Sequence, residues 1–340
     1  MKNILVTGGA GYVGSHVIVS LLEQGYGAVS VDNFYNSSPK VYQRLRELTG
    51  KDFIDIEADV CDEAKMKEVM AKHDLWAVIH CAGYKAVPES VSKPLEYYQN
   101  NLGTTFSLCN AMRQTGVTRF VFSSSATVYG EPQFLPYTEE HPTGNCTNPY
   151  GMSKVMNERI LTDMAAANPD WGVVLLRYFN PIGAHPSGRI GDAPGGIPNN
   201  IMPYILKVAN GLLPVLPIAG DDYDTPDGTG LRDYLHISDL AEGHVAALRY
   251  LEDFTGSEAV NLGTGQSVSV RELIRGIEKT SGKTLPTEIK SRRPGDIAEA
   301  RADVSKAKRL FGWETKKTLE EMCADAWRWA SQNPQGYEGE

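Results

Sequence analysis

The chain has 340 residues, of which 41% are hydrophobic, 22% charged and 9% aromatic. This composition is ordinary for a globular protein and excludes a collagen, a coiled coil and global disorder. The formal net charge is −9, and Lys and Arg form no run longer than pairs such as Arg292-Arg293. A broad nucleic-acid surface is therefore not expected, and an anionic partner should be small and locally bound.

The cysteines and the N-terminal sequence indicate the cellular compartment of the protein. The five cysteines show no CxxC spacing and the seven histidines are scattered, so we expect reduced thiols and no metal site. The first apolar run ends after Val6 at a glycine-rich turn, which fits neither a signal peptide nor a membrane span. We expect a cytoplasmic protein with no nucleic-acid and no membrane partner.

Short apolar runs alternate with segments of helical spacing through the first half of the chain, and this pattern predicts parallel βαβ units. The predicted strands are residues 3–7, 28–31, 53–56, 77–80, 120–123 and 173–177. The predicted helices are residues 11–24, 62–72, 96–115 and 150–168. The expected fold class is α/β, a doubly wound parallel sheet of the Rossmann type with a smaller C-terminal α/β substrate-binding lobe.

The texture of the chain changes after Asn180, where a long stretch rich in Gly and Pro predicts an extended loop of functional importance. Residues 303–334 are expected to be mostly helical, and residues 334–340 to be frayed. The expected division is a cofactor-binding domain over residues 1–180, with later segments at about 232–250 interleaved, and a lobe mainly for substrate over residues 181–340.

A glycine-rich turn follows the first predicted strand. Gly8, Gly11 and Gly14 would let the backbone turn tightly and bring a diphosphate to the helix N-terminus. Asp32 ends the second strand, where its carboxylate can accept hydrogen bonds from both adenosine ribose hydroxyls; it would repel a 2′-phosphate and so favours NAD over NADP. A merely structural turn is the alternative. Asp59 could reach the adenine amino group or be an exposed loop acid.

Tyr150 and Lys154 stand four residues apart, on one face of a predicted helix, and the preceding strand ends at Ser125. The start of this helix and the end of this strand should lie at the same edge of the sheet. A free phenol has a pKa near 10, about three units above that of an ideal general base. Lys154 and an oxidised nicotinamide would favour the phenolate, and Ser125 could hydrogen-bond it. An amphipathic surface pair is the alternative.

Longer strings then carry a resemblance. GGAGYVG, Asp32, SSSATVYG at 123–130, NPYGMSK at 148–154, LRYFNPIGAHPSG at 176–188 and RDYLHISDLAEGH at 232–244 resemble the UDP-glucose 4-epimerases of the extended short-chain dehydrogenase/reductase superfamily. The resemblance runs nearly end to end. It implies tightly bound NAD, inversion at sugar carbon 4 through a 4-keto intermediate, a role in galactose metabolism and a homodimer joined through the helices near 96–115 and 150–168.

The resemblance also implies site residues. In this scheme Tyr150 takes the 4-hydroxyl proton, Lys154 lowers the tyrosine pKa, and Ser125 assists. Cofactor contacts are implied for Gly8, Gly11, Tyr12, Val13, Gly14, Asp32, Asn33, Asn36, Asp59, Val60, Cys81, Ala82, Gly83, Lys85, Asn100, Ser123, Tyr150, Lys154 and Tyr178. UDP-sugar contacts are implied for Lys85, Ser125, Thr127, Tyr150, Asn180, Asn200, Ile201, Leu216, Ala219, Arg232, Arg293, Asp296 and Ala300.

Three positions depart from the family pattern. Ala300 is small where epimerases restricted to UDP-glucose and UDP-galactose carry a bulky residue, which implies activity on UDP-GlcNAc and UDP-GalNAc as well. Ala219 stands where a Phe commonly lies against the uracil, so that stacking contact is in doubt. Tyr84 replaces a Leu near the nicotinamide.

Three other readings compete with the epimerase. A sugar-nucleotide 4,6-dehydratase shares fold and cofactor but usually has an Asp-Glu pair where Ala126 and Thr127 stand here. A non-enzymatic dinucleotide-binding regulator would typically lack the Tyr and Lys. A net dehydrogenase would release NADH, whereas an epimerase consumes no added cofactor.

Overall fold

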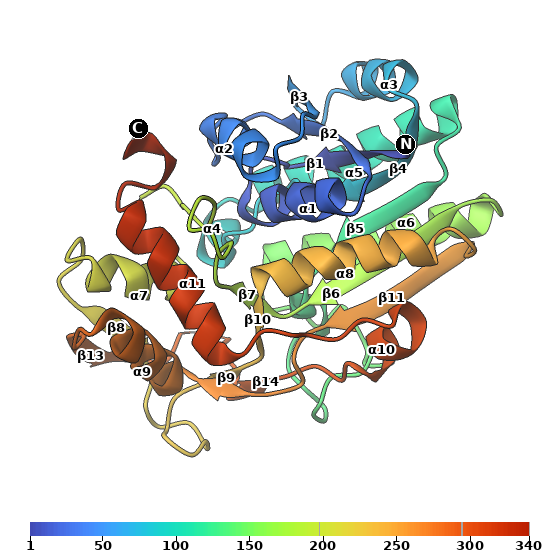
Figure 1. The fold of residues 1–340 in the computed structure, drawn as a ribbon. Helices are drawn as coiled ribbons and strands as arrows, with labels where there is room; N and C mark the ends of the chain where they lie inside the picture. The colour runs from blue at the N-terminus through green and yellow to red at the C-terminus, as the bar shows by residue number, and fades with distance from the viewer. Residues whose placement is uncertain (197, 294, 340) are drawn as a thin grey trace.

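The computed structural model describes residues 1–196, 198–293 and 295–339. A seven-stranded parallel sheet, with strand order β11-β6-β5-β4-β1-β2-β3, forms its centre (Figure 1). Its strands are β1 (Asn3–Thr7), β2 (Gly27–Asp32), β3 (Ile54–Glu57), β4 (Leu75–His80), β5 (Arg119–Ser123), β6 (Gly172–Tyr178) and β11 (Gly256–Leu262). The expected doubly wound α/β class is confirmed.

Helices cover both faces of the sheet, because each central strand sends alternate apolar side chains to opposite sides. Ile4 and Val6 of β1 join one buried cluster and Leu5 joins another. The first cluster packs under α1 (Tyr12–Glu23), α2 (Lys40–Thr49) and α8 (Ile237–Tyr250). The second packs under α3 (Glu63–Lys72), α5 (Pro94–Thr115) and α6 (Pro149–Ala167). A short α4 (Val87–Ser92) precedes α5, and η1 (Ala126–Tyr129) follows β5.

The second half of the chain builds a smaller lobe from short strands and helices. Its small sheets pair β7 (Asn180–Ile182) with β10 (Tyr234–His236), β8 (Leu216–Ala219) with β13 (Thr287–Lys290), and β9 (Leu231–Arg232) with β12 (Val268–Ser269) and β14 (Glu299–Ala300). Its helices are α7 (Ile201–Ala209), α9 (Val270–Ser281) and α11 (Leu319–Gln332), whereas α10 (Ser305–Phe311) packs against α8 and β11 of the main sheet. In Figure 1, α7, α9 and α11 lie together to one side of the main sheet.

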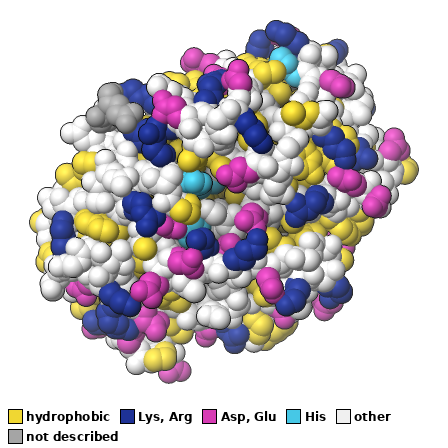
Figure 2. All heavy atoms as spheres, in the orientation of Figure 1, with side chains coloured by type: hydrophobic (Ala, Val, Ile, Leu, Met, Phe, Trp, Pro, Cys, Tyr) yellow, Lys and Arg dark blue, Asp and Glu magenta, His cyan; other side chains and the backbone are white. Residues whose placement is uncertain are grey.

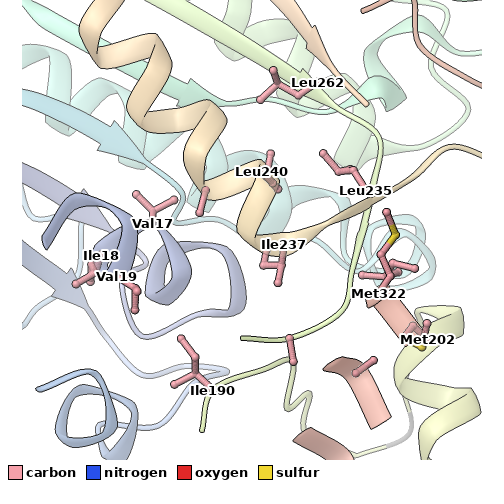
Figure 3. Close-up of a cluster of buried hydrophobic side chains, with 14 of the residues drawn as sticks. Val17, Ile18, Val19, Ile190, Met202, Leu235, Ile237, Leu240, Leu262 and Met322 are labelled. Carbon is pink, nitrogen blue, oxygen red and sulfur yellow. The ribbon is translucent and has the colours of Figure 1, made fainter. Parts of the chain in front are cut away.

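One buried cluster runs from the main sheet into the lobe. Figure 3 shows Val17 on α1 and Leu240 on α8 in the same region as Met202 of α7 and Met322 of α11. The range expected to form the lobe also supplies β11, which pairs with β6 at the edge of the main sheet. The main sheet therefore includes a strand that lies beyond residue 250.

The expectation of a frayed C-terminus is wrong for residues 334–339, and Glu340 lies outside the described residues. Residues Gly336–Gly339 form a 3-10 turn, η2, and Tyr337 is buried. The Tyr337 hydroxyl donates to the Gly191 carbonyl and accepts from the Gly191 amide, each at 3.0 Å. The short C-terminal sequence gave no signal of this contact, because it depends on a loop nearly 150 residues away.

Lys or Arg and Asp or Glu are interspersed over the face shown in Figure 2, and many form exposed pairs such as Lys316–Glu242 at 2.6 Å. The described part of the chain contains no helix that is long and apolar enough to cross a membrane. It also contains no group of three or more His, Cys, Asp or Glu side chains arranged to hold a metal ion.

Candidate functional site

The turn between β1 and α1 is shaped so that only glycine fits. Gly8 has a φ of +68°, and a Cβ there would lie 2.8 Å from the Ala82 amide nitrogen. A Cβ on Gly14 would lie 2.1 Å from the Gly8 carbonyl oxygen. Gly11 is the N-cap of α1 and has no side chain to cap it, and the first turn of the helix contains no acidic residue. Its first amide groups therefore face an open cradle that suits a diphosphate.

Asp32 at the end of β2 is buried and stabilises this turn through hydrogen bonds. Its Oδ2 accepts from the Ala10 amide at 3.0 Å, and its Oδ1 accepts from the Phe34 amide at 2.8 Å and the Ser37 hydroxyl at 2.9 Å. A carboxylate offers about four acceptor positions, so one remains for a ligand. Asp32 thus holds the protein's own loop as well as facing the site, which the sequence did not indicate.

The other expected cofactor contacts come from the ends of neighbouring strands. The Cys81 and Ala82 amides donate to Thr7 at the end of β1, at 3.1 and 3.3 Å. Asp59 accepts from the Cys61 amide at 2.8 Å, and the Asn100 amide group donates to Asn101 at 3.0 Å. Buried Val60 and partly buried Gly83 lie on the turns after β3 and β4. Asn33, Asn36 and Lys85 are exposed on the surrounding loops.

Tyr12 and Val13 are the first two residues of α1, and Tyr12 links this helix to the segment after β7. Its hydroxyl donates to the Gly183 carbonyl at 2.8 Å, just beyond β7. Tyr178, at the end of β6, is enclosed beside Ser123, and burial raises the pKa of its phenol well above the ordinary value. The Ser123 hydroxyl lies 2.7 Å from His244 Nε2 and 3.2 Å from Cys81 Sγ. These contacts join β4, β5 and α8 at the edge where the strands end.

Tyr150 and Lys154 lie on the first turns of α6, which Asn148 caps by accepting from the Gly151 amide at 2.8 Å. Both side chains are buried. Lys154 Nζ donates to the Ser123 carbonyl at 2.7 Å and lies 5.9 Å from the centre of the Tyr150 ring. The Ser125 hydroxyl accepts from the amide and the hydroxyl of Thr127, at 3.2 and 3.0 Å. The helix face and the strand end meet as the spacing predicts.

The electrostatics of this pair differ from the expectation in one respect. Burial raises the pKa of the Tyr150 phenol, and a hydrogen bond with Ser125 is what lowers it. Burial also lowers the pKa of Lys154, to about 8, against smaller opposing effects of Cys81 and Glu158. Lys154 is not among the groups that lower the phenol pKa; its ammonium group donates to the Ser123 carbonyl and lies over the Tyr150 ring.

Sequence reasoning missed the buried ion pair behind Lys154. Glu158, one further turn along α6, accepts from Arg177 Nη2 at 2.7 Å and from the Ser124 hydroxyl at 2.6 Å. These contacts tie α6 to β5 and β6. The signal was present in the sequence, because residues 150, 154 and 158 continue one helical stripe.

The expected substrate residues fall into two groups. In the first, β9 and β14 place Arg232 beside Ala300, and the Asn180 amide donates to the Asp233 carbonyl at 3.0 Å. Arg232 donates to Asp296 and to the Ile297 carbonyl, each at 3.0 Å. The second group is spread over α7 and β8 and consists of Asn200, Ile201, Leu216 and Ala219. Arg293 is exposed, on a turn in which its carbonyl accepts from the Asp296 amide at 3.1 Å.

The arrangement fits a dinucleotide and a second anionic ligand, and the family match agrees. Residues 4–263 match the family described as "NAD dependent epimerase/dehydratase family". The chain belongs to this family, whose cofactor is NAD. The glycine cradle, which a single Cβ would fill, is the feature of the structure that fits this group.

Several similar proteins are UDP-glucose 4-epimerases, a more specific class than the family. The UDP-glucose 4-epimerase of Bacillus subtilis (strain 168) is 57% identical over 334 residues, which cover 98% of each chain. The human UDP-glucose 4-epimerase is 51% identical, over 99% of this chain and 98% of that one. The crystal structure of UDP-glucose 4-epimerase from Bifidobacterium longum in complex with NAD⁺ and UDP has a TM-score of 0.96 and 52% identity, covering 98% of this chain and all of that one.

A further solved relative has a broader name. The UDP-Glc/GlcNAc 4-epimerase from Campylobacter jejuni has a TM-score of 0.86 and 36% identity, covering 98% of this chain and all of that one.

Proposed function

We propose that this protein is a UDP-glucose/UDP-galactose 4-epimerase that inverts sugar carbon 4 reversibly with its own tightly bound NAD. The observation that carries the proposal is the buried Tyr150, with Ser125 and Lys154 around it, at the sheet edge where the glycine cradle opens. Near-complete coverage of several UDP-glucose 4-epimerases at more than 50% identity supports the same activity.

In the proposed reaction Tyr150 accepts the proton of the sugar 4-hydroxyl and returns it after the sugar has turned over. NAD⁺, when bound, would supply the hydride acceptor and a positive charge. Ser125 stabilises the phenolate by donating a hydrogen bond, and Thr127, which donates to Ser125, orients that hydroxyl. Lys154 acts as a positioning residue, since its ammonium group is fixed on the Ser123 carbonyl.

The cofactor residues are proposed to divide the dinucleotide between them. The α1 N-terminus, with Gly8, Gly11, Tyr12, Val13 and Gly14, would receive the diphosphate. Asp32 with Asn33 and Asn36 would take the adenosine ribose, and Asp59 with Val60 the adenine. The nicotinamide half would be enclosed by Tyr178 and by residues at and after the ends of β4 and β5. These residues are Cys81, Ala82, Gly83, Lys85, Asn100 and Ser123.

The lobe is proposed to hold the UDP part of the substrate. Arg232 is the best-supported contact, because its side chain is only about one-fifth exposed. Hydrogen bonds to Asp296 and to the Ile297 carbonyl fix the orientation of its guanidinium group. A planar, fixed fork suits a diphosphate. Arg293, Asn180, Asn200, Ile201, Leu216 and Ala219 complete the proposed contacts, and residues 181–340 form the proposed substrate lobe apart from α8 and β11.

The test is an assay with no added cofactor. The purified protein should convert UDP-galactose to UDP-glucose, release NAD on denaturation and accumulate no free NADH. Accumulation of NADH would favour a net dehydrogenase, and a 4-keto-6-deoxy sugar product would favour a dehydratase. Bound NAD without any interconversion would favour a regulator.

A broader substrate range is proposed from Ala300. This residue is half-buried against a cluster containing Tyr129, Tyr137 and Phe179, and its small side chain leaves room for an acetamido group. We expect turnover of UDP-GlcNAc and UDP-GalNAc. Ala300→Tyr should reduce that activity about tenfold or more relative to UDP-galactose, while Ala300→Gly should retain both. Equal losses on both sugar pairs in the Tyr variant would contradict the proposal.

A homodimer through α5 and α6 is also proposed, in a cytoplasmic protein. Leu95 and Phe106 on α5 and Met156 on α6 are 69%, 50% and 38% exposed, and the two helices pack side by side. Exposed apolar side chains on neighbouring helices are typical of a contact surface. Light scattering should give twice the chain mass, and Phe106→Glu should shift it to the monomer. A monomeric wild-type protein would contradict the proposal.

A further inference from the structure

Two tyrosines meet across the end of the sheet, between loops that follow different strands. Tyr35 lies in the loop after β2, and Tyr84 lies in the loop after β4. Both strands are neighbours of β1, so their ends are separated by about 10 Å, twice the strand spacing. Their ring centroids are nevertheless only 4.9 Å apart, with the planes tilted by 38°. The ring pair therefore crosses the end of β1, where the glycine cradle begins.

The Tyr84 side of this bridge is firmly held. The Asn101 side chain accepts from the Tyr84 amide at 2.8 Å and donates to the Tyr84 carbonyl at 3.1 Å. The Tyr84 ring also packs edge-on against the buried Tyr97, at 5.4 Å between centroids. The position of the Tyr84 ring is thus fixed by α5, in which both Asn101 and Tyr97 lie.

The Tyr35 side is more open. Tyr35 is 60% exposed, and its amide donates to the Asn33 side chain at 3.1 Å. The preceding residue, Phe34, has a φ of +55°, a left-handed conformation that is uncommon for a bulky side chain. Asp32 holds this conformation by accepting from the Phe34 amide. The loop can therefore leave its position only by breaking the Tyr35–Tyr84 contact and releasing Asp32.

The residues around the bridge are those proposed to hold adenosine. Burial raises the pKa of Tyr84, and Tyr35 and then Asp59 raise it further. Asp32 supports the Tyr35 loop, as above. A dinucleotide that runs from Asp32 toward Tyr150 must cross the end of β1 and hence pass the ring pair.

We propose that Tyr35 and Tyr84 form an aromatic clasp across the end of β1, over the proposed path of the cofactor, that slows the release of NAD. The inference rests on the proposed function only in that NAD follows this path. An aromatic pair of this kind contributes enough for the contact to retard release roughly two- to tenfold. No role in proton transfer is implied, because neither ring is near Ser125 or Tyr150 in the contacts described above.

The test measures cofactor exchange instead of turnover. Purified holoenzyme is incubated with excess labelled NAD, and incorporation of the label is followed over time for Tyr84→Leu, Tyr35→Ala and the double variant. Each single variant should exchange roughly two- to tenfold faster than the wild type. The double variant should exchange no faster than the faster single variant, because both substitutions remove the same contact.

Two controls separate the clasp from general loosening. Tyr84→Phe keeps the ring and should exchange at the wild-type rate. Tyr250→Leu removes one ring of a comparable pair, Tyr250–Phe254 at 4.7 Å, at the C-terminus of α8, and should also leave exchange unchanged. Melting curves show whether each variant is folded.

Unchanged exchange in both single variants would overturn the clasp while leaving a working epimerase. Strictly multiplicative effects in the double variant would also overturn it, since the rings would then act separately. A wild-type protein that carries no NAD and interconverts no UDP-sugar would instead overturn the proposed function together with the clasp.

Discussion

The two halves of the site are built from different materials. On the cofactor side the essential features are backbone: a glycine turn, the amide groups at the start of α1 and the ends of parallel strands. On the substrate side they are side chains such as Arg232, carried by strands of only two to four residues in separate small sheets. Substitutions that add atoms should therefore impair the cofactor side, and substitutions that remove hydrogen-bond donors should impair the substrate side.

The largest effect is expected where the two halves meet. Tyr150→Phe removes the proposed proton acceptor but keeps the buried ring, so turnover should fall about 10²- to 10⁴-fold with NAD content unchanged. Initial rates with UDP-galactose and the absorbance of released cofactor measure both quantities. Tyr26→Phe is the matched control and should retain full activity. Turnover within a factor of two of the wild type would exclude Tyr150 as the acceptor.

The next effect tests the backbone half. Gly14→Ala places a methyl group 2.1 Å from the Gly8 carbonyl oxygen, so the cradle must deform. Overpacking of this kind costs about 1–3 kcal/mol, which would weaken NAD binding roughly 5- to 150-fold. The purified variant should carry little NAD. In the control variant Gly195→Ala the added methyl group contacts no other atom, so this variant should carry the normal amount of NAD. Full cofactor content in Gly14→Ala would show that the turn does not form the cradle.

The smaller effect tests the side-chain half. Arg232→Lys retains the charge but cannot reproduce three directed donors to Leu231, Ile297 and Asp296. We expect the KM for UDP-galactose to rise about tenfold, with NAD content unchanged. Arg159→Lys, which alters an exposed ion pair on α6, should leave both unchanged. Loss of NAD in Arg232→Lys would contradict the separation of the two halves.

The same contrast explains what could be predicted from the sequence. The glycine turn, Asp32 and the 150/154 pair are local patterns, and the structure places them at the expected element ends. The Arg232–Asp296 pair joins residues 64 apart, and the link between Tyr337 and Gly191 spans 146. Such contacts depend on how short elements pack, which no periodicity records. The resemblance named the substrate residues, but residue spacing alone could not.

The pKa of Tyr150 shows a different limit. The spacing of Tyr150 and Lys154 correctly placed both on one helix face, yet the side chain of Lys154 turns to the Ser123 carbonyl. Side-chain direction is set by the strand that the helix packs against, and the sequence of the helix does not contain it. Burial therefore dominates, and it raises the phenol pKa.

The proposed reaction requires that the hydrogen removed from sugar carbon 4 returns to the same sugar molecule. UDP-galactose deuterated at carbon 4 can be mixed with undeuterated UDP-galactose carrying ¹³C in the sugar, and the UDP-glucose formed analysed by mass spectrometry. The account predicts that deuterium remains at carbon 4 and stays in the ¹²C molecules. Deuterium lost to solvent, or found in the ¹³C molecules, would contradict it.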